Sequence, residues 1–171
     1  MWSVNVLVTG RPGSGKTTVI ERVGEMLPRS SATGFFTREI RSRGVRRGFA
    51  IHTLAGDSAV LARTGGSGPR VGRYRVHPEA LDEVAVPSLA VRSGTRVIVV
   101  DEIGKMEVLS SAFCDAVRAA LDARVSVLAT IARSGGGFIG EVRARHDVTI
   151  VEVTAANRDR LPGDLLRRLG F

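Results

Sequence analysis

The sequence predicts an α/β fold whose central sheet is mainly parallel and carries an antiparallel β insertion. Short apolar runs alternate with segments of helical spacing, which is typical of a parallel sheet covered by helices on both faces. The clearest run is residues 95–102, where four consecutive β-branched residues indicate a strand buried on both faces. Residues 33–76 show a different pattern, with strand-like stretches separated by turns, and predict antiparallel strands inserted into the chain.

Each expected element follows from its own local pattern. Pro78 suits the first position of a helix that Pro87 could break. Asp164 is expected to cap the final helix, which Gly170 ends, and residues 135–137 predict a glycine loop or hinge. In chain order we expect strands at 4–8, 32–40, 47–54, 95–102, 125–130 and 148–153, short apolar pieces at 59–62 and 71–76, and helices at 17–26, 78–91, from 107 or 110 to 123, 138–146 and 165–169.

The turn between the first strand and the first helix carries the strongest motif. Residues 10–17 fit G-x-x-x-x-G-K-[ST], a phosphate-binding loop, at every fixed position. Its backbone N–H groups are expected to point into one concavity, and the helix N-terminus adds partial positive charge. We expect Lys16 to reach the β- and γ-phosphates of a nucleotide and the Thr17 hydroxyl to coordinate Mg²⁺. The nucleotide-binding residues expected here are Gly10, Arg11, Pro12, Gly13, Ser14, Gly15, Lys16, Thr17 and Thr18.

A second motif stands at the end of the strand at 95–102. Asp101 occupies the usual place of the carboxylate that holds Mg²⁺, so Thr17 and Asp101 are the expected metal ligands. Glu102 is expected to contact the nucleotide and to act as the general base that orients or deprotonates the attacking water, with Lys16 as the other catalytic residue. The alternative is that both carboxylates only end the strand with polar groups.

Several weaker candidates each have an ordinary structural alternative. Thr130 ends the strand expected beside the Asp101 strand and could sense the γ-phosphate, or be only a β-branched strand residue. Lys105 could bind the nucleotide or lie exposed at a helix start. Asn157 follows the last strand, where it could contact the nucleobase or form a turn. Cys114 has helical apolar spacing and is expected in the core. Arg38, Arg133 and Arg158 could stabilise charge on a transferred phosphoryl group, although surface exposure is the simpler reading for each.

Composition bounds the remaining possibilities. The 171 residues predict a single domain spanning 1–171, and no apolar run approaches the 18 or so residues that span a bilayer. One cysteine excludes a disulfide framework and a cysteine metal cluster. No signal peptide is evident, and the lone cysteine makes a cytoplasmic location the default expectation. We also expect a monomer without membrane partners. The net charge of +8 would allow a nucleic-acid partner, but no nucleic-acid motif supports one.

With both motifs identified, the chain resembles the small nucleoside-triphosphatases of thermophilic bacteria and archaea and their human cancer-related counterpart. The resemblance implies a three-layer, RecA-like P-loop NTPase fold and slow hydrolysis of ATP, GTP and other nucleoside triphosphates with little base preference. It covers nearly the whole chain. Its motifs are residues 9–18, 34–41, 48–49, 71–74, 101–107 and 157–158, of which 101–107 (Asp-Glu-Ile-Gly-Lys-Met-Glu) is the most specific.

The motifs are compatible with three functions. The first is Mg²⁺-dependent hydrolysis of nucleoside 5′-triphosphates to the diphosphate and phosphate. The second is a small kinase that transfers phosphate to a nucleotide, nucleoside or RNA end. The third is a nucleotide-gated RNA-binding module, for which steep salt dependence of RNA binding is required. A base-selective GTPase is disfavoured because the chain has no Asn-Lys-x-Asp stretch.

Overall fold

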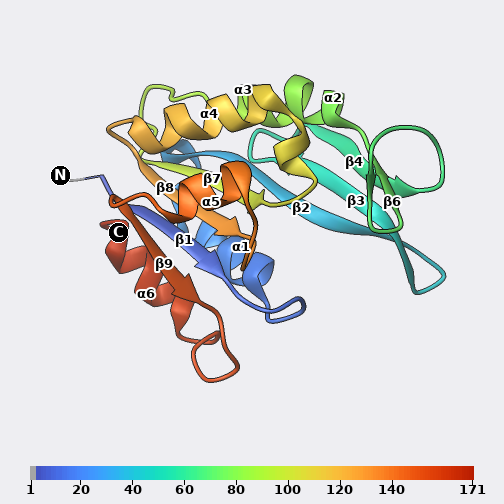
Figure 1. Ribbon diagram of the computed structural model, residues 1–171. Helices are drawn as coiled ribbons and strands as arrows, with labels where there is room; N and C mark the ends of the chain where they lie inside the picture. The colour runs from blue at the N-terminus through green and yellow to red at the C-terminus, as the bar shows by residue number, and fades with distance from the viewer. Residues whose placement is uncertain (1–2) are drawn as a thin grey trace.

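The computed structural model describes residues 3–171 and contains a nine-stranded mixed sheet in the order β5-β6-β4-β3-β2-β7-β8-β1-β9. Figure 1 shows the sheet running across the molecule, with helices above and below one half of it. This arrangement confirms the predicted α/β class with an antiparallel β insertion. In the described residues, no helix is both long enough and apolar enough to cross a membrane.

One half of the sheet is parallel. Its strands lie side by side in the order β2, β7, β8, β1, β9. Alternate residues of β7 pack into opposite cores: Ile98 faces one cluster and Val99 the other. This is the burial on both faces that the run of β-branched residues predicts. The bounds are Asn5–Thr9 for β1, Ala32–Ser42 for β2, Val97–Ile103 for β7, Ser126–Ile131 for β8 and Val148–Glu152 for β9.

The other half of the sheet is antiparallel and corresponds to the predicted insertion. In β2, residues 32–35 pair in parallel with β7, and residues 35–42 pair antiparallel with β3. The insertion therefore shares a strand with the parallel half instead of standing apart from it. A glycine sits in the parallel part: Gly34 has a φ of +117°, and a Cβ there would lie 1.9 Å from the Val99 carbonyl oxygen. The further strands are β3 (Val45–Thr53), β4 (Ser58–Thr64), β5 (Arg70–Val71) and β6 (Tyr74–Val76).

Helices cover the two faces of the parallel half and make the fold three-layered (Figure 1). Ile20 of α1 and Leu165 of α6 pack into one core cluster, whereas Phe113 of α4 and Ile139 of α5 pack into the other. The bounds are Lys16–Met26 for α1, Arg29–Ser31 for η1, Pro78–Ala80 for α2, Leu81–Ala85 for η2, Val86–Ser88 for α3, Glu107–Leu109 for η3, Ser111–Asp122 for α4, Gly137–Arg143 for α5 and Leu161–Arg168 for α6.

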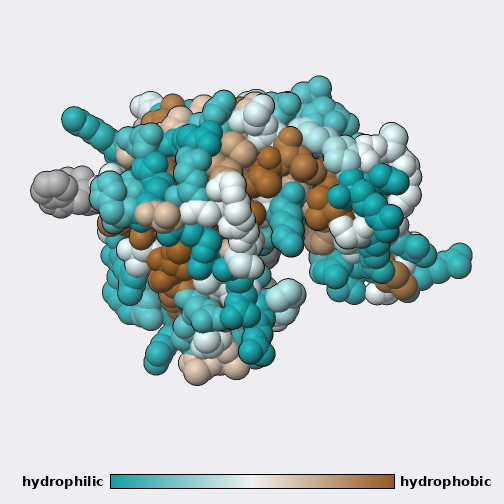
Figure 2. Space-filling model, in the orientation of Figure 1, coloured by the Kyte–Doolittle hydropathy of each residue, from teal (hydrophilic) through white to brown (hydrophobic). Residues whose placement is uncertain are grey.

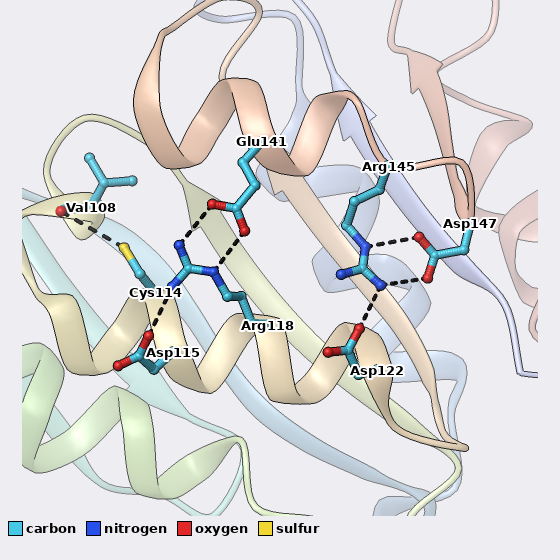
Figure 3. A network of polar contacts seen from close by, with 8 residues as sticks. All are labelled: Val108, Cys114, Asp115, Arg118, Asp122, Glu141, Arg145 and Asp147. Carbon is cyan, nitrogen blue, oxygen red and sulfur yellow. Dashed lines mark hydrogen bonds and ion pairs between the residues drawn. The ribbon is translucent and has the colours of Figure 1, made fainter.

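Ion pairs on the surface hold α5 against α4, as Figure 3 shows. The Arg118 guanidinium donates to both carboxylate oxygens of Glu141 at 2.7 Å and lies over the Phe138 ring, 4.8 Å from its centroid. Arg145 in turn bridges Asp122 and Asp147. These contacts fix the helix that follows β8.

Several predicted helix boundaries are wrong, among them the end of the helix expected at 138–146, which lies at Arg143. The final helix begins at Leu161, so Asp164 lies in its first turn and is not the cap; Pro162 near the start supplies a fixed φ instead. The helical segment that opens at Pro78 ends at Ser88 instead of residue 91. It is not broken at Pro87, and its irregular part is the π-helical turn η2, which immediately precedes α3. The glycine loop is shorter than predicted because Gly137 already belongs to α5.

Candidate nucleotide-binding site

The phosphate-binding loop forms at the predicted place. It joins β1 to α1, and Gly15 precedes the first helical residue with φ 97° and ψ 22°, a left-handed conformation that glycine adopts without strain. No side chain caps this helix, so its first N–H groups are left to a ligand in the loop. The Lys16 side chain folds back over the loop, where Nζ donates to the Gly10 carbonyl oxygen at 3.3 Å.

Asp101 is buried beneath the loop, with 1% of its surface exposed. The Thr130 hydroxyl donates to Oδ1 at 2.5 Å, and the Thr37 backbone N–H and hydroxyl donate to Oδ2 at 3.4 and 3.3 Å. Burial raises the pKa of Asp101, and hydrogen bonds from Thr130, Thr17 and Thr37 oppose that rise. The Thr17 contact joins the first helix of the chain to the end of β7.

Glu102 faces the same space from the next position of β7. Burial raises the pKa of its carboxyl group, the neighbouring charge of Asp101 raises it further, and the Lys16 ammonium lowers it. Lys16 and Glu102 both line one cavity of about 720 Å³. Residues more than eighty positions apart thus converge at the carboxyl ends of parallel strands, where open α/β sheets bind ligands.

Glu107 belongs to the same cluster and was not assigned a role by sequence reasoning. It lies in the short turn η3, is 5% exposed and lines the cavity. Burial, followed by the charge of Glu102, raises its pKa well above the usual value. A Cβ on Gly104 would lie 2.5 Å from Oε1 of Glu102 and 3.0 Å from Oε2 of Glu107, so both carboxyl groups border the same glycine. Its place in the 101–107 motif was the available signal.

The other predicted residues divide into those that line the cavity and those that do not. Asn157 does not line it: Oδ1 accepts from the Thr154 N–H and Nδ2 donates to the Glu152 carbonyl, both at 2.8 Å, so the side chain closes the turn after β9. Its nucleobase contact stays a prediction. The lining residues are Pro12, Gly13, Gly15, Lys16, Thr17, Thr18, Glu102 and Lys105, whereas Gly10, Arg11, Ser14 and the buried Asp101 are not part of the lining.

Most of the remaining candidates have local partners among the described residues, and the exception is the Arg158 side chain. The Thr130 hydroxyl is committed to Asp101, as described above. Arg38 lines the cavity and pairs with Glu21 at 2.9 Å, and Arg133 lies 3.8 Å from Glu152. Cys114 is buried in α4, which confirms its predicted place, and its thiol contacts the Val108 carbonyl (Figure 3). Arg158 is exposed.

The donor chemistry of the site fits a hard divalent cation. The Thr17 hydroxyl and the Asp101 carboxylate approach each other and offer oxygen only, as Mg²⁺ prefers. Asp101 is also a buried carboxylate that forms no ion pair with a described basic side chain, so a bound cation would balance its charge. Within residues 3–171, no group of three or more histidine, cysteine or acidic side chains is placed to hold a metal alone, so the phosphates of a ligand would complete such a site.

Comparisons with known proteins agree with this geometry. The family model described as NTPase matches residues 5–166. The chain is 44% identical to the nucleoside-triphosphatase THEP1 of Thermotoga petrophila over 98% of the chain and 94% of that protein, and 43% identical to the protein of the same name from Thermofilum pendens over 99% and 97%.

Two solved structures share the fold. THEP1 from Aquifex aeolicus superposes with a TM-score of 0.89 at 34% identity over 98% of this chain and 100% of that one. A human cancer-related nucleoside triphosphatase superposes with a TM-score of 0.82 at 37% identity over 99% and 98%. The family model matches almost the whole chain, and the relatives are of similar length. Together with a P-loop beside which buried carboxylates converge, these matches show that the chain belongs to the NTPase family of P-loop nucleoside-triphosphatases.

Proposed function

We propose that the protein hydrolyses nucleoside 5′-triphosphates to the diphosphate and phosphate, that it requires Mg²⁺, and that it accepts several bases. The observation that carries the proposal is the convergence of Lys16 and Glu102 on one cavity beside the buried Asp101. The names of the relatives support hydrolysis in particular.

Each residue has a part that follows from its surroundings. The uncapped N–H groups of the loop and the Lys16 ammonium bind the β- and γ-phosphates. Thr17 and Asp101 would hold a magnesium ion, which supplies positive charge against the phosphate oxygens. Glu102 accepts a proton from water aligned with the terminal phosphorus. Its raised pKa suits this part because a general base works best when its pKa lies near the operating pH.

Broad base specificity is supported by what surrounds the loop. The residue best placed after β9 to read a base, Asn157, uses its amide within its own turn. No Asn-Lys-x-Asp stretch occurs in the sequence.

Phosphate release by Glu102→Gln tests the proposal. We expect wild-type protein with Mg²⁺ to release phosphate from ATP, GTP, CTP and UTP, and Glu102→Gln to bind these nucleotides normally with turnover lowered about 100-fold, as for loss of a general base. Glu83→Gln, at an exposed position, is the matched control and should keep full turnover. Undiminished turnover in Glu102→Gln would remove this residue from the mechanism, and a wild-type protein that releases no phosphate would overturn the proposed function.

A further inference from the structure

The cavity extends well past the phosphate-binding loop, into the antiparallel insertion. On that side its apolar lining comes from Phe49 of β3, Leu61 of β4, Val71 of β5 and Met106 before η3. Arg46 and Lys105 line the same part. We call these six residues the insert chamber. Figure 2 shows hydrophobic residues gathered beside a deep notch between the two halves of the molecule.

The strand order places the chamber beyond the terminal phosphate. Lys16 follows β1 and Glu102 lies on β7, two strands away, while the chamber is built by β3, β4 and β5 farther in the same direction. A triphosphate with its β- and γ-phosphates on Lys16 and its terminal phosphorus toward Glu102 runs back from there to its nucleoside, away from the insertion. The nucleotide of the proposed function, on which this inference rests, would therefore leave the chamber unfilled.

The walls of the chamber are suited to an aromatic ring. The rings of Phe49 and Tyr74 meet edge to face, with centroids 5.1 Å apart, which holds Phe49 in place where it lines the cavity. Leu61, which also lines the cavity, is fully buried. These apolar walls offer no hydrogen bonds to water. A flat apolar molecule bound against them would remove their surface from solvent, which is favourable.

The polar side chains of the chamber are held in place or ready to bind. Arg46 donates from Nε to the Tyr74 hydroxyl at 3.0 Å and from Nη1 to Glu39 at 2.7 Å, and its guanidinium lies 5.5 Å from the Phe49 ring centroid. Nη2 of Arg46 has no hydrogen-bond partner among the described residues, and the same holds for the Lys105 ammonium. Polar substituents of a ring compound could accept from both.

We propose that the insert chamber binds a second small molecule, an aromatic ring compound of nucleoside size that carries an alcohol, and that this alcohol accepts the terminal phosphoryl group. The alcohol oxygen forms a bond to the γ-phosphorus as the bond from that phosphorus to the β–γ bridging oxygen breaks. Glu102 takes the alcohol proton, and the nucleoside diphosphate leaves with the bridging oxygen and its electron pair. Hydrolysis is the same reaction with water in the position of the alcohol.

The test follows a labelled terminal phosphate of ATP in the presence of Mg²⁺ and one of three alcohols. Thymidine and benzyl alcohol carry a ring, and glycerol is the control without one. We expect label on the ring alcohols at least tenfold above label on glycerol. Saturation-transfer NMR of the ring protons, recorded without nucleotide, provides a readout that does not depend on activity.

Two variants make the test specific to the chamber. Val71→Trp fills it, and Phe49→Leu removes its ring at similar volume; each should lower the ratio of labelled alcohol to free phosphate at least tenfold and weaken the NMR signal. Val91→Trp, the same change at a position 53% exposed outside the cavity, should alter neither. Circular dichroism verifies folding. Free phosphate with no labelled alcohol and no NMR signal would overturn the chamber proposal and leave hydrolysis intact, whereas absence of phosphate release without any alcohol would overturn the proposed function itself.

Discussion

In the parallel half of the sheet, the carboxyl groups of Asp101, Glu102 and Glu107 are withdrawn from water, and none forms an ion pair with a described basic side chain. In the antiparallel half, the exposed carboxylate of Glu39 instead accepts hydrogen bonds from Arg41 and Arg46 at 2.8 and 2.7 Å. Burial has raised the pKa values of the first group. For Glu39, burial raises the pKa, but the hydrogen bonds and charges of Arg41 and Arg46 together outweigh it, and the pKa is lowered.

This difference in the environment of the carboxylates indicates that the two halves have different functions. A buried carboxylate without a cation is costly, and hydroxyl hydrogen bonds such as those from Thr130 and Thr37 offset only part of that cost. The parallel half therefore holds buried carboxylates without a positive partner, a charge imbalance that a bound divalent cation would offset. In the antiparallel half, the Glu39 carboxylate is already paired with arginines, and this pairing holds Arg46 beside Phe49 in a fixed geometry.

The two lysines of the chain test this division most strongly. Lys16→Ala should weaken binding of the magnesium–ATP complex about 100-fold, or about 2.7 kcal/mol, because a charged hydrogen-bond donor to phosphate is lost from the parallel half. Lys105→Ala, at an exposed position on the insertion side, should weaken it about threefold or less. Isothermal titration calorimetry measures both. Equal effects of the two changes would mean that the phosphates do not lie where the loop places them.

Two buried threonines give a smaller contrast. Thr130→Val removes the hydroxyl that donates to the buried Asp101 carboxylate and should lower the free energy of unfolding by about 2 kcal/mol. Thr53→Val in β3 removes only an acceptor for the neutral Asp57 N–H, and should cost about 1 kcal/mol. Urea unfolding without metal compares them. A Thr130→Val protein as stable as wild type would show that Asp101 does not depend on this donor.

The sequence predicted the loop, the two carboxylates at the end of β7 and the antiparallel insertion because each has a strong local signal. Fixed glycine and lysine spacing specifies the loop, and four β-branched residues specify a strand buried on both faces. Asp164 was misplaced because aspartate is common both as a cap and in the first turn, and only the position of Leu161 in the core decides between them.

The contacts that complete the site depend on tertiary packing and have no sequence period. Thr37 reaches Asp101 because β2 pairs with β7, sixty-four residues later. Glu107 sits in the short turn η3, whose burial follows from its packing against α4 and β7. The insert chamber likewise needs β3, β4 and β5 to be placed beside the end of β7, and no single one of these segments indicates it.

The last contrast between the two halves is a difference of sign in the pH dependence of stability. The pKa of Glu107 is raised from its model-peptide value of 4.5, so its favourable contribution is complete below pH 4.5 and is lost as pH rises through the raised pKa. Glu107→Gln should therefore flatten the decline in stability above pH 4.5, by up to about 1.4 kcal/mol per pH unit in the window between the two pKa values.

Glu39→Gln should change the pH dependence of stability below pH 4.5 instead of above it. The pKa of Glu39 is lowered, so its contribution is present above pH 4.5 and is lost as pH falls through the lowered pKa. Removing this carboxylate should flatten the acid limb and leave the alkaline limb unchanged. Urea unfolding of metal-free protein from pH 3 to pH 9 follows both limbs for both variants. If the two substitutions changed the same limb, the carboxylates of the two halves would share one electrostatic environment, and the charge imbalance assigned to the parallel half would have no basis.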